Sequence, residues 1–235
     1  MNKKIGIIGA MDVEVNLLKS CLEATKTTEA GGLVFVEGLL NKIPVIIVKS
    51  GVGKVNAALC TQRLILQMGA THIINTGIAG AMAKGLRVLD FVVSTDALYH
   101  DMDATGFGYK ISEIPQMKVS DFPADKKMVE AAEKAFAELP ESQNHKLIAG
   151  RIATGDQFIS DRAIKEKIAQ NCSPACVEME GAAIAHAAYI NRIPFLIIRC
   201  MSDMADDTGE NTYSFNEESA AKLSAELVKK VVTRI

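Results

Sequence analysis

The sequence predicts an α/β fold in which helices cover both faces of a mostly parallel or mixed, twisted sheet. Short apolar runs, as at 5–9 and 195–200, are typical of strands that are buried on both faces. Segments between these runs place apolar residues at helical spacing, so strands and helices alternate along the chain. No repeat or linker interrupts the 235 residues. We therefore expect a single domain over residues 1–235, built as three αβα layers.

The first half of the chain supplies most of the predicted strands. The apolar patterns predict a strand at 5–9, a helix over 13–24, and strands at 33–40 and 43–49 that are joined by a turn at Asn41-Lys42. A tight glycine turn at 51–53 precedes a second helix. A strand at 72–75 is then expected to end in a small-residue loop at 76–80, before another strand at 91–94.

The second half begins with a long stretch, 98–122, that has little periodicity. Loops of this length in compact domains are usually functional or disordered. A helix over 124–138, a strand at 147–153 and a short helix over 162–170 follow. We then expect a strand that ends at Glu180, a helix of small residues over 181–188, a strand at 194–200 and a final helix from about 216.

Composition excludes several classes of partner. Apolar residues make up 49% of the chain and the formal charge is -2, so there is no basic footprint for nucleic acid or an anionic membrane. No apolar run approaches the ~18 residues of a membrane helix, and the first apolar run is too short for a secretory signal. The five cysteines form no C-x-x-C pair and are expected to be reduced thiols. We expect a cytoplasmic protein.

Three carboxylates follow three of the predicted strands. Glu14 comes after the run 5–11, Glu180 ends the run 176–180, and Asp203 comes after the run 195–202. Ligands of open α/β sheets bind beyond the carboxyl ends of the strands. Each acid alone could simply cap or complement a helix. Together they predict a site for acid/base chemistry.

Other motifs do not predict a cofactor. Gly6 and Gly9 lack the G-x-G-x-x-G spacing of a dinucleotide site, and Gly51-Val52-Gly53-Lys54 lacks the spacing of a phosphate loop. A metal site at His100, Asp101 and Asp103 is a second possibility, but we favour a polar loop because no further His or Cys cluster accompanies these residues. We expect no metal and no cofactor.

Six motifs, in register over nearly the whole chain, resemble the bacterial 5′-methylthioadenosine/S-adenosylhomocysteine nucleosidases, which belong to the nucleoside phosphorylase superfamily. They are Ile7-Ile8-Gly9-Ala10-Met11 with Glu14, Ser50-Gly51-Val52-Gly53-Lys54-Val55-Asn56, Asn75-Thr76-Gly77-x-Ala79-Gly80, Gly155-Asp156-x-Phe158-Ile159, Val177-Glu178-Met179-Glu180 and Arg199-x-x-Ser202-Asp203. The resemblance implies a nucleoside phosphorylase-like fold and cleavage of an N-glycosidic bond without a cofactor.

The resemblance also implies roles for individual residues. Glu14 would activate the attacking water, Asp203 with Ser202 would protonate N7 of the leaving adenine, and Glu180 would bind the ribose 2′-hydroxyl. Phe158 would stack on the purine. The remaining residues that it assigns to the substrate pocket are Met11, Val52, Ile78, Ala79, Gly80, Ile159, Val177, Glu178, Met179 and Phe215.

Departures from the pattern bear on the nucleophile and the substrate. Phosphate-binding arginines of the related phosphorylases are replaced here by Val13 and Asn75, and a loop serine by Ile78, which favours water. A phosphorylase, or a nucleosidase for another 5′-modified adenosine such as 5′-deoxyadenosine or aminodeoxyfutalosine, stays a possible alternative. A non-catalytic nucleoside-binding protein is disfavoured because all three acids are present.

The family implies a homodimer. In its members a loop of one subunit closes the pocket of the other. Phe107, Tyr109 and Pro115 lie in the long stretch that would form this loop. Exposed aromatic side chains on such a loop suit an interface, although they could also pack onto their own subunit.

Overall fold

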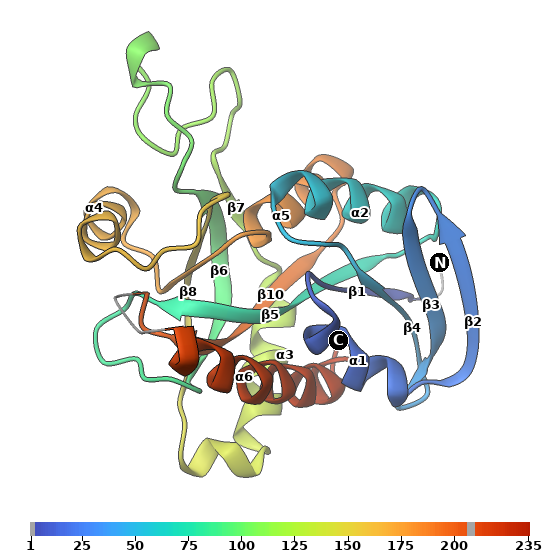
Figure 1. Ribbon diagram of the computed structural model, residues 1–235. Coiled ribbons are helices and arrows are strands. Elements are labelled where there is room, and N and C mark those ends of the chain that lie inside the picture. The colour runs from blue at the N-terminus through green and yellow to red at the C-terminus, as the bar shows by residue number, and fades with distance from the viewer. Residues whose placement is uncertain (1–2, 206–209) are drawn as a thin grey trace.

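The protein is described by a computed structural model that covers residues 3–205 and 210–235, with side chains for 3–205 and 216–235. A mixed sheet forms its centre (Figure 1). The strands are β1 (Ile5–Gly9), β2 (Glu23–Ala30), β3 (Leu33–Leu40), β4 (Ile43–Lys49), β5 (His72–Ala81), β6 (Phe91–Tyr99), β7 (Asp121–Pro123), β8 (Leu147–Thr154), β9 (Cys176–Glu178) and β10 (Phe195–Asp203). The helices are α1 (Asp12–Ser20), α2 (Lys54–Leu66), α3 (Lys126–Ala137), α4 (Arg162–Cys172), α5 (Gly181–Asn191) and α6 (Glu210–Val231), with 3₁₀ turns η1 (Thr105–Phe107) and η2 (Pro140–Gln143).

The strand order is β10-β6-β8-β9-β5-β1-β4-β3-β2, and β5 also pairs with β10. The second pairing closes β10, β6, β8, β9 and β5 into a ring. β1 pairs in parallel with both β4 and β5. The pairs β2–β3 and β5–β9 are antiparallel. The predicted mixed sheet is thus confirmed, and β5 and β6 each pair with three other strands.

Helices cover both faces of this sheet, as predicted. In Figure 1, α2 and α5 lie side by side on one face, and α1, α3 and α6 lie on the other. Successive residues of β1 face opposite layers, since Ile7 belongs to the core beneath α6 and Ile8 to the core beneath α2. Burial on both faces explains why the strands read as continuous apolar runs.

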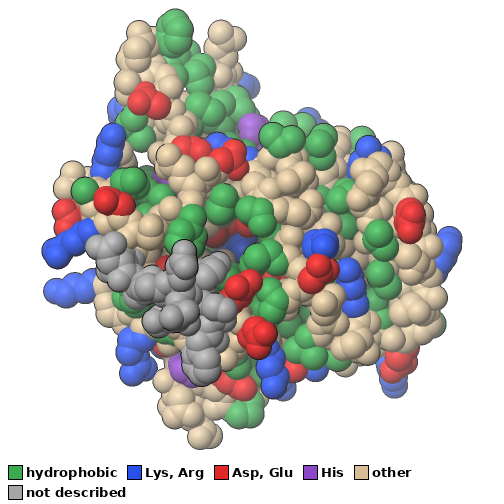
Figure 2. All heavy atoms as spheres, in the orientation of Figure 1, with side chains coloured by type: hydrophobic (Ala, Val, Ile, Leu, Met, Phe, Trp, Pro, Cys, Tyr) green, Lys and Arg blue, Asp and Glu red, His purple; other side chains and the backbone are tan. Residues whose placement is uncertain are grey.

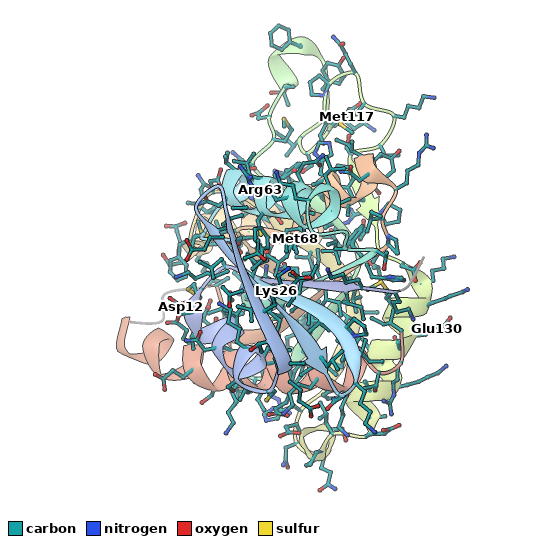
Figure 3. The ribbon with its side chains drawn as sticks, turned by 90° about the vertical axis from the view of Figure 1, so that its right-hand side faces the viewer. Asp12, Lys26, Arg63, Met68, Met117 and Glu130 are labelled. Atoms are coloured by element: carbon teal, nitrogen blue, oxygen red, sulfur yellow. The ribbon has the colours of Figure 1, made fainter. Side chains whose placement is uncertain are left out.

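Several element boundaries differ from the sequence-based prediction. The expected loop 76–80 is strand, because β5 continues to Ala81 and pairs there with β9. The helix that was expected to reach residue 24 ends at Ser20, and the polar segment Glu23–Ala30 forms edge strand β2. Figure 3 looks onto this edge, where Lys26 lies on β2 and discourages pairing with another chain. The last helix begins at Glu210, not near 216.

The stretch between β6 and β7 projects from the body of the protein (Figure 1). It holds η1 and a second bend near Met117, which is labelled in Figure 3. This agrees with the long loop that the sequence predicts at 98–122, apart from the ends that join β6 and β7. Within the described residues, no helix is long and apolar enough to cross a membrane.

Candidate active site

A cavity of about 120 Å³ lies where β1, β5, β9 and β10 end. A smaller cavity adjoins it, lined by some of the same residues together with Gln157 and Ile159. The larger cavity is lined by Ala10, Met11, Glu14, Val52, Ile78, Ala79, Gly80, Phe158, Val177, Glu178, Met179, Glu180, Arg199, Ser202 and Asp203. The structure therefore brings together all three carboxylates that the sequence singles out, and they come from distant parts of the chain.

Glu14 is buried in the first turn of α1 and its side chain folds back to the end of β1. Oε2 accepts N–H bonds from Ala10 (2.6 Å) and Met11 (3.0 Å), and Oε1 accepts one from Ile78 (3.1 Å). The residue thus caps its own helix and lines the cavity at once. Burial raises the pKa of Glu14, opposed by Arg199 and the three N–H groups, so the carboxylate is a stronger base than an exposed one.

Arg199 is the main residue that the sequence analysis did not assign. Its guanidinium is buried and donates to Asn75 Oδ1 (2.6 Å), Ile78 O (3.2 Å) and Glu178. Nη1 also lies 3.9 Å from Glu14 Oε1. A lone arginine within the apolar run 195–200 is the signal that could have identified it, since a buried charge needs partners.

Glu178 organises this region through a carboxylate that accepts hydrogen bonds from four groups. It accepts hydrogen bonds from Arg199 and Thr154, and from the N–H groups of Glu180 (3.0 Å) and Gly181 (2.7 Å) at the start of α5. The capping role considered for Glu180 therefore belongs to Glu178. β9 ends at Glu178, so the strand that was expected to end at Glu180 is two residues shorter.

Glu180 stands at the N-cap position of α5, and its carboxylate turns into the cavity. Oε1 accepts the Gly53 N–H (2.9 Å), and Oε2 lies 3.5 Å from Arg199 Nη2. Burial, and next the negative charge of Glu178, raise the pKa of Glu180 to about 7. We call Glu14, Glu178, Glu180 and Arg199 the floor of the cavity; formally, three carboxylates face one guanidinium there.

Asp203 ends β10 at an irregularity in the sheet. The register with β5 shifts between Met201 and Asp203, and such bulges are frequent beside active sites because they redirect side chains. Asp203 Oδ2 lies 2.8 Å from Ser202 Oγ, and Oδ1 accepts the Ala205 N–H (2.7 Å). A Cβ at Gly80 would approach Oδ1 to 3.0 Å, so this glycine leaves room for the carboxylate.

The opening of the cavity is apolar. Hydrophobic side chains surround a hollow near the middle of the face in Figure 2, with charged side chains inside it. Val52 and Phe158 are pocket-lining yet exposed, Phe158 by 59%. Together with the projecting loop 100–120 we call them the rim.

The residues predicted for the partner-subunit loop do not line the cavity. Phe107 in η1 is 88% exposed, and neither it nor Tyr109 nor Pro115 lines the cavity of its own chain. Phe215 falls outside the residues whose side chains are described. No group of three or more His, Cys, Asp or Glu among the described residues is arranged to hold a metal ion. Asp101 instead pairs with Lys54.

Comparison with known proteins gives a consistent result. The family model of the phosphorylase superfamily matches residues 4–234. The 5′-methylthioadenosine/S-adenosylhomocysteine nucleosidase of Psychromonas ingrahamii is 43% identical over 235 residues, 99% of each chain. The crystal structure of the nucleosidase of the same name from Colwellia psychrerythraea, in complex with adenine, has a TM-score of 0.94 at 41% identity and covers 100% of this chain and 96% of that one.

A related structure has a different name. The native futalosine hydrolase of Helicobacter pylori has a TM-score of 0.92 at 29% identity, with 99% of this chain and 98% of that chain covered. The full-length match to the superfamily and the higher identity to the nucleosidases decide the assignment. The chain belongs to the phosphorylase superfamily and, within it, to the family of the 5′-methylthioadenosine/S-adenosylhomocysteine nucleosidases.

Proposed function

We propose that this protein is a cytoplasmic hydrolase that cleaves the N-glycosidic bond of 5′-methylthioadenosine and S-adenosylhomocysteine. The products are adenine and the corresponding 5′-thioribose. The observation that carries the proposal is the convergence of Glu14, Glu180 and Asp203 in one cavity with an apolar opening. The names of the relatives support the choice of substrate.

The chemistry needs charge stabilisation at both ends of the breaking bond. As the bond lengthens, the ribose gains positive charge and the adenine gains negative charge. Carboxylates near the sugar stabilise the first, and a proton donor at the base neutralises the second. The floor is rich in carboxylate and suits the sugar, whereas Asp203 stands apart from it with Ser202 and suits the base.

Glu14 is the proposed general base. Its raised pKa makes it a better proton acceptor for the attacking water. The three N–H groups fix its orientation without using every lone pair, because each carboxylate oxygen can accept two hydrogen bonds. Oε1 accepts one N–H bond and keeps one lone pair for water.

Asp203 is the proposed general acid toward N7 of adenine. Its contact with Ser202 works in either protonation state, because a hydroxyl both donates and accepts. When Asp203 carries the proton and directs it at N7, Ser202 can instead donate to Ala79 O, 3.4 Å away. After proton transfer, Ser202 turns its hydrogen to Oδ2 and stabilises the new carboxylate.

Glu180 is the proposed partner of the ribose 2′-hydroxyl. The Gly53 N–H holds one of its oxygens in place, which leaves acceptor capacity on both oxygens for the sugar. Phe158 and Ile159 at the adjoining cavity are the proposed contacts of the purine, and Met11 and Val52 those of the 5′-thio substituent.

Water is preferred over phosphate as the nucleophile on electrostatic grounds. Arg199 is the cation of the floor, and its single positive charge already faces the carboxylates of Glu14, Glu178 and Glu180. A phosphate dianion would meet Glu14 and Glu180 at close range in a poorly hydrated site, where repulsion between like charges is strong. No step of this mechanism uses a metal or a cofactor.

A second candidate function is hydrolysis of another 5′-modified adenosine, such as 5′-deoxyadenosine or aminodeoxyfutalosine. The structural similarity to futalosine hydrolase supports this second candidate. The chemistry of the floor would be unchanged, because these substrates differ at the 5′ position. The discrimination between different 5′ substituents would depend on residues of the rim.

We also propose a homodimer. Val55 and Leu59 on α2 and Ile190 on α5 are exposed on helices that lie side by side, and Phe107 projects on the loop nearby. Apolar residues gathered in this way are typical of interfaces. Light scattering at micromolar concentration tests the proposal: a mass near twice 25.3 kDa supports it, and a mass near 25.3 kDa refutes it.

The decisive experiment on function is adenine release from 5′-methylthioadenosine and S-adenosylhomocysteine, measured with and without phosphate. We expect release without phosphate and no acceleration by it. Release that requires phosphate would identify a phosphorylase. Release from 5′-deoxyadenosine or aminodeoxyfutalosine, with none from either thioadenosine, would support the second candidate.

A further inference from the structure

Lys54 occupies an unusual position for a lysine. It is the first residue of α2, where the helix dipole disfavours positive charge, and no acidic residue in that first turn offsets it. Its partners come from other segments. Nζ lies 2.6 Å from Asp101 Oδ2 and 3.6 Å from Asp156 Oδ2.

Asp156 provides the cap that α2 lacks. The N-cap residue is Gly53, which has no side chain, and Asp156 Oδ1 accepts the Lys54 N–H (2.9 Å) in its place. Asp156 in turn donates its own N–H to Asp101 Oδ2 (3.0 Å). These bonds connect the three residues in a closed network, which we call the Lys54 cluster (Lys54, Asp101 and Asp156).

Each member of the cluster belongs to a segment that carries a part of the proposed substrate site. Val52 and Gly53, the donor to Glu180, directly precede Lys54. Phe158 follows two residues after Asp156. Asp101 begins the projecting loop. The cluster itself does not line the cavity.

We propose that the Lys54 cluster positions substrate-binding residues. It fixes the segment of Val52 and Gly53 relative to the segment of Phe158. This inference rests on the proposed function. The side chains of Lys54 and Asp101 are only 27% and 19% exposed, so their ion pair is shielded from solvent more than a surface pair. Phe158 is 59% exposed and lies on the same segment as Asp156.

The test compares Lys54→Met with Lys4→Met. Lys4 pairs with Glu37 at 2.5 Å, with side chains 29% and 22% exposed, so the two ion pairs match in length and burial. Lys4 precedes β1, at the end of the strand opposite the cavity. We expect Lys54→Met to raise KM for 5′-methylthioadenosine by about tenfold, or about 1.4 kcal/mol, with kcat within about threefold. Lys4→Met should leave both constants unchanged.

Two additional variants separate positioning from general stability. Lys54→Arg keeps the positive charge, so its KM should lie close to the wild-type value. In a Phe158→Ala background, Lys54→Met should raise KM much less than in wild type, because the two residues act on the same contact. Melting temperatures of both methionine variants should fall by similar amounts.

The outcomes are distinguishable. A Lys54→Met enzyme with wild-type KM would overturn the positioning role while the proposed function stands. An effect that is fully additive with Phe158→Ala would overturn the part of that role that acts through Phe158. A loss of kcat and melting temperature without a change in KM would also overturn it and indicate a structural role alone. A wild-type enzyme that releases no adenine from any 5′-modified adenosine would overturn the proposed function, and the inference with it.

Discussion

The floor and the rim of the cavity are built in opposite ways. Floor carboxylates are buried at strand ends and helix starts, and each accepts at least one backbone N–H. Rim residues such as Val52 and Phe158 are exposed and lie on connecting segments. The difference teaches that the buried charges of the floor are preorganised, whereas the exposed rim is the part that a bound molecule could still rearrange.

The largest effect is expected from the proposed base in the floor. Glu14→Gln removes the proton acceptor and should lower kcat about 10³-fold, as expected for the loss of general base catalysis. Asp12→Asn is the matched control, since Asp12 lies in the same helical turn but is exposed and paired with Lys49. Steady-state adenine release measures both. A Glu14→Gln enzyme with kcat within fivefold of wild type would rule out the base assignment.

A substitution at Gly77 can disturb the packing of the floor while every charged side chain of the floor is kept. A Cβ at Gly77 would overlap Glu14 Oε1 and Arg199 Nη1, so Gly77→Ala should displace both and lower kcat about 100-fold. Gly150→Ala is the control, because its Cβ would meet Ala175 Cβ at 2.7 Å, another crowded position outside the cavity lining. It should lower the melting temperature and leave kcat intact. Equal kcat losses in both variants would contradict this account.

The pH dependence sharpens the comparison, because the pKa of Glu180 is raised to about 7. Only its ionised form accepts a ribose hydroxyl through both oxygens, and roughly a tenth is ionised one pH unit below the pKa. KM should therefore rise up to about tenfold between pH 8 and pH 6, and Glu180→Gln should flatten this profile. By linkage, the same shift stabilises the fold below the ordinary glutamate pKa of 4.5, and this contribution is lost as pH rises through about 7.

The smallest effect is expected at the rim. In the proposed homodimer Phe107 would reach the pocket of the other subunit, so Phe107→Ala should raise KM for 5′-methylthioadenosine by about fivefold. The affinity for adenine should stay unchanged, because adenine lacks the 5′ group. Calorimetric titration with adenine, together with KM, separates these effects. A parallel loss of adenine affinity would place Phe107 near the purine instead of the 5′ side.

The sequence predicted the layers and the convergence of the acids because both follow from buried strands. Runs such as 5–9 are apolar on both faces, and the ends of such strands meet in space. It failed at β2, whose polar, exposed residues have no alternating pattern. It also failed at residues 76–80, where small residues resemble a loop but pair in β5.

The division of work within the floor could not be predicted either. Glu178 and Glu180 have the same side chain, and the sequence alone suggests capping for Glu180. The structure assigns the cap to Glu178, because β9 ends there and its carboxylate turns back over Glu180 and Gly181. The role of Arg199 could not be predicted either, since its hydrogen-bond partners range from Glu180, 19 residues away in the sequence, to Asn75, 124 residues away.

The pairing of β5 with β10 has a consequence for how the protein acquires its site during synthesis. Ile73 pairs with Phe195, so the central strand stays incomplete until most of the chain has been made. Until β10 docks, Glu14, Glu178 and Glu180 lack the guanidinium of Arg199 as a counter-ion. Their three carboxylates then repel one another as they become buried. A chain released before β10 therefore has neither a closed ring of strands nor a counter-ion. Among the described strands β10 comes last in the sequence, and it supplies the counter-ion that the carboxylates of the earlier segments need.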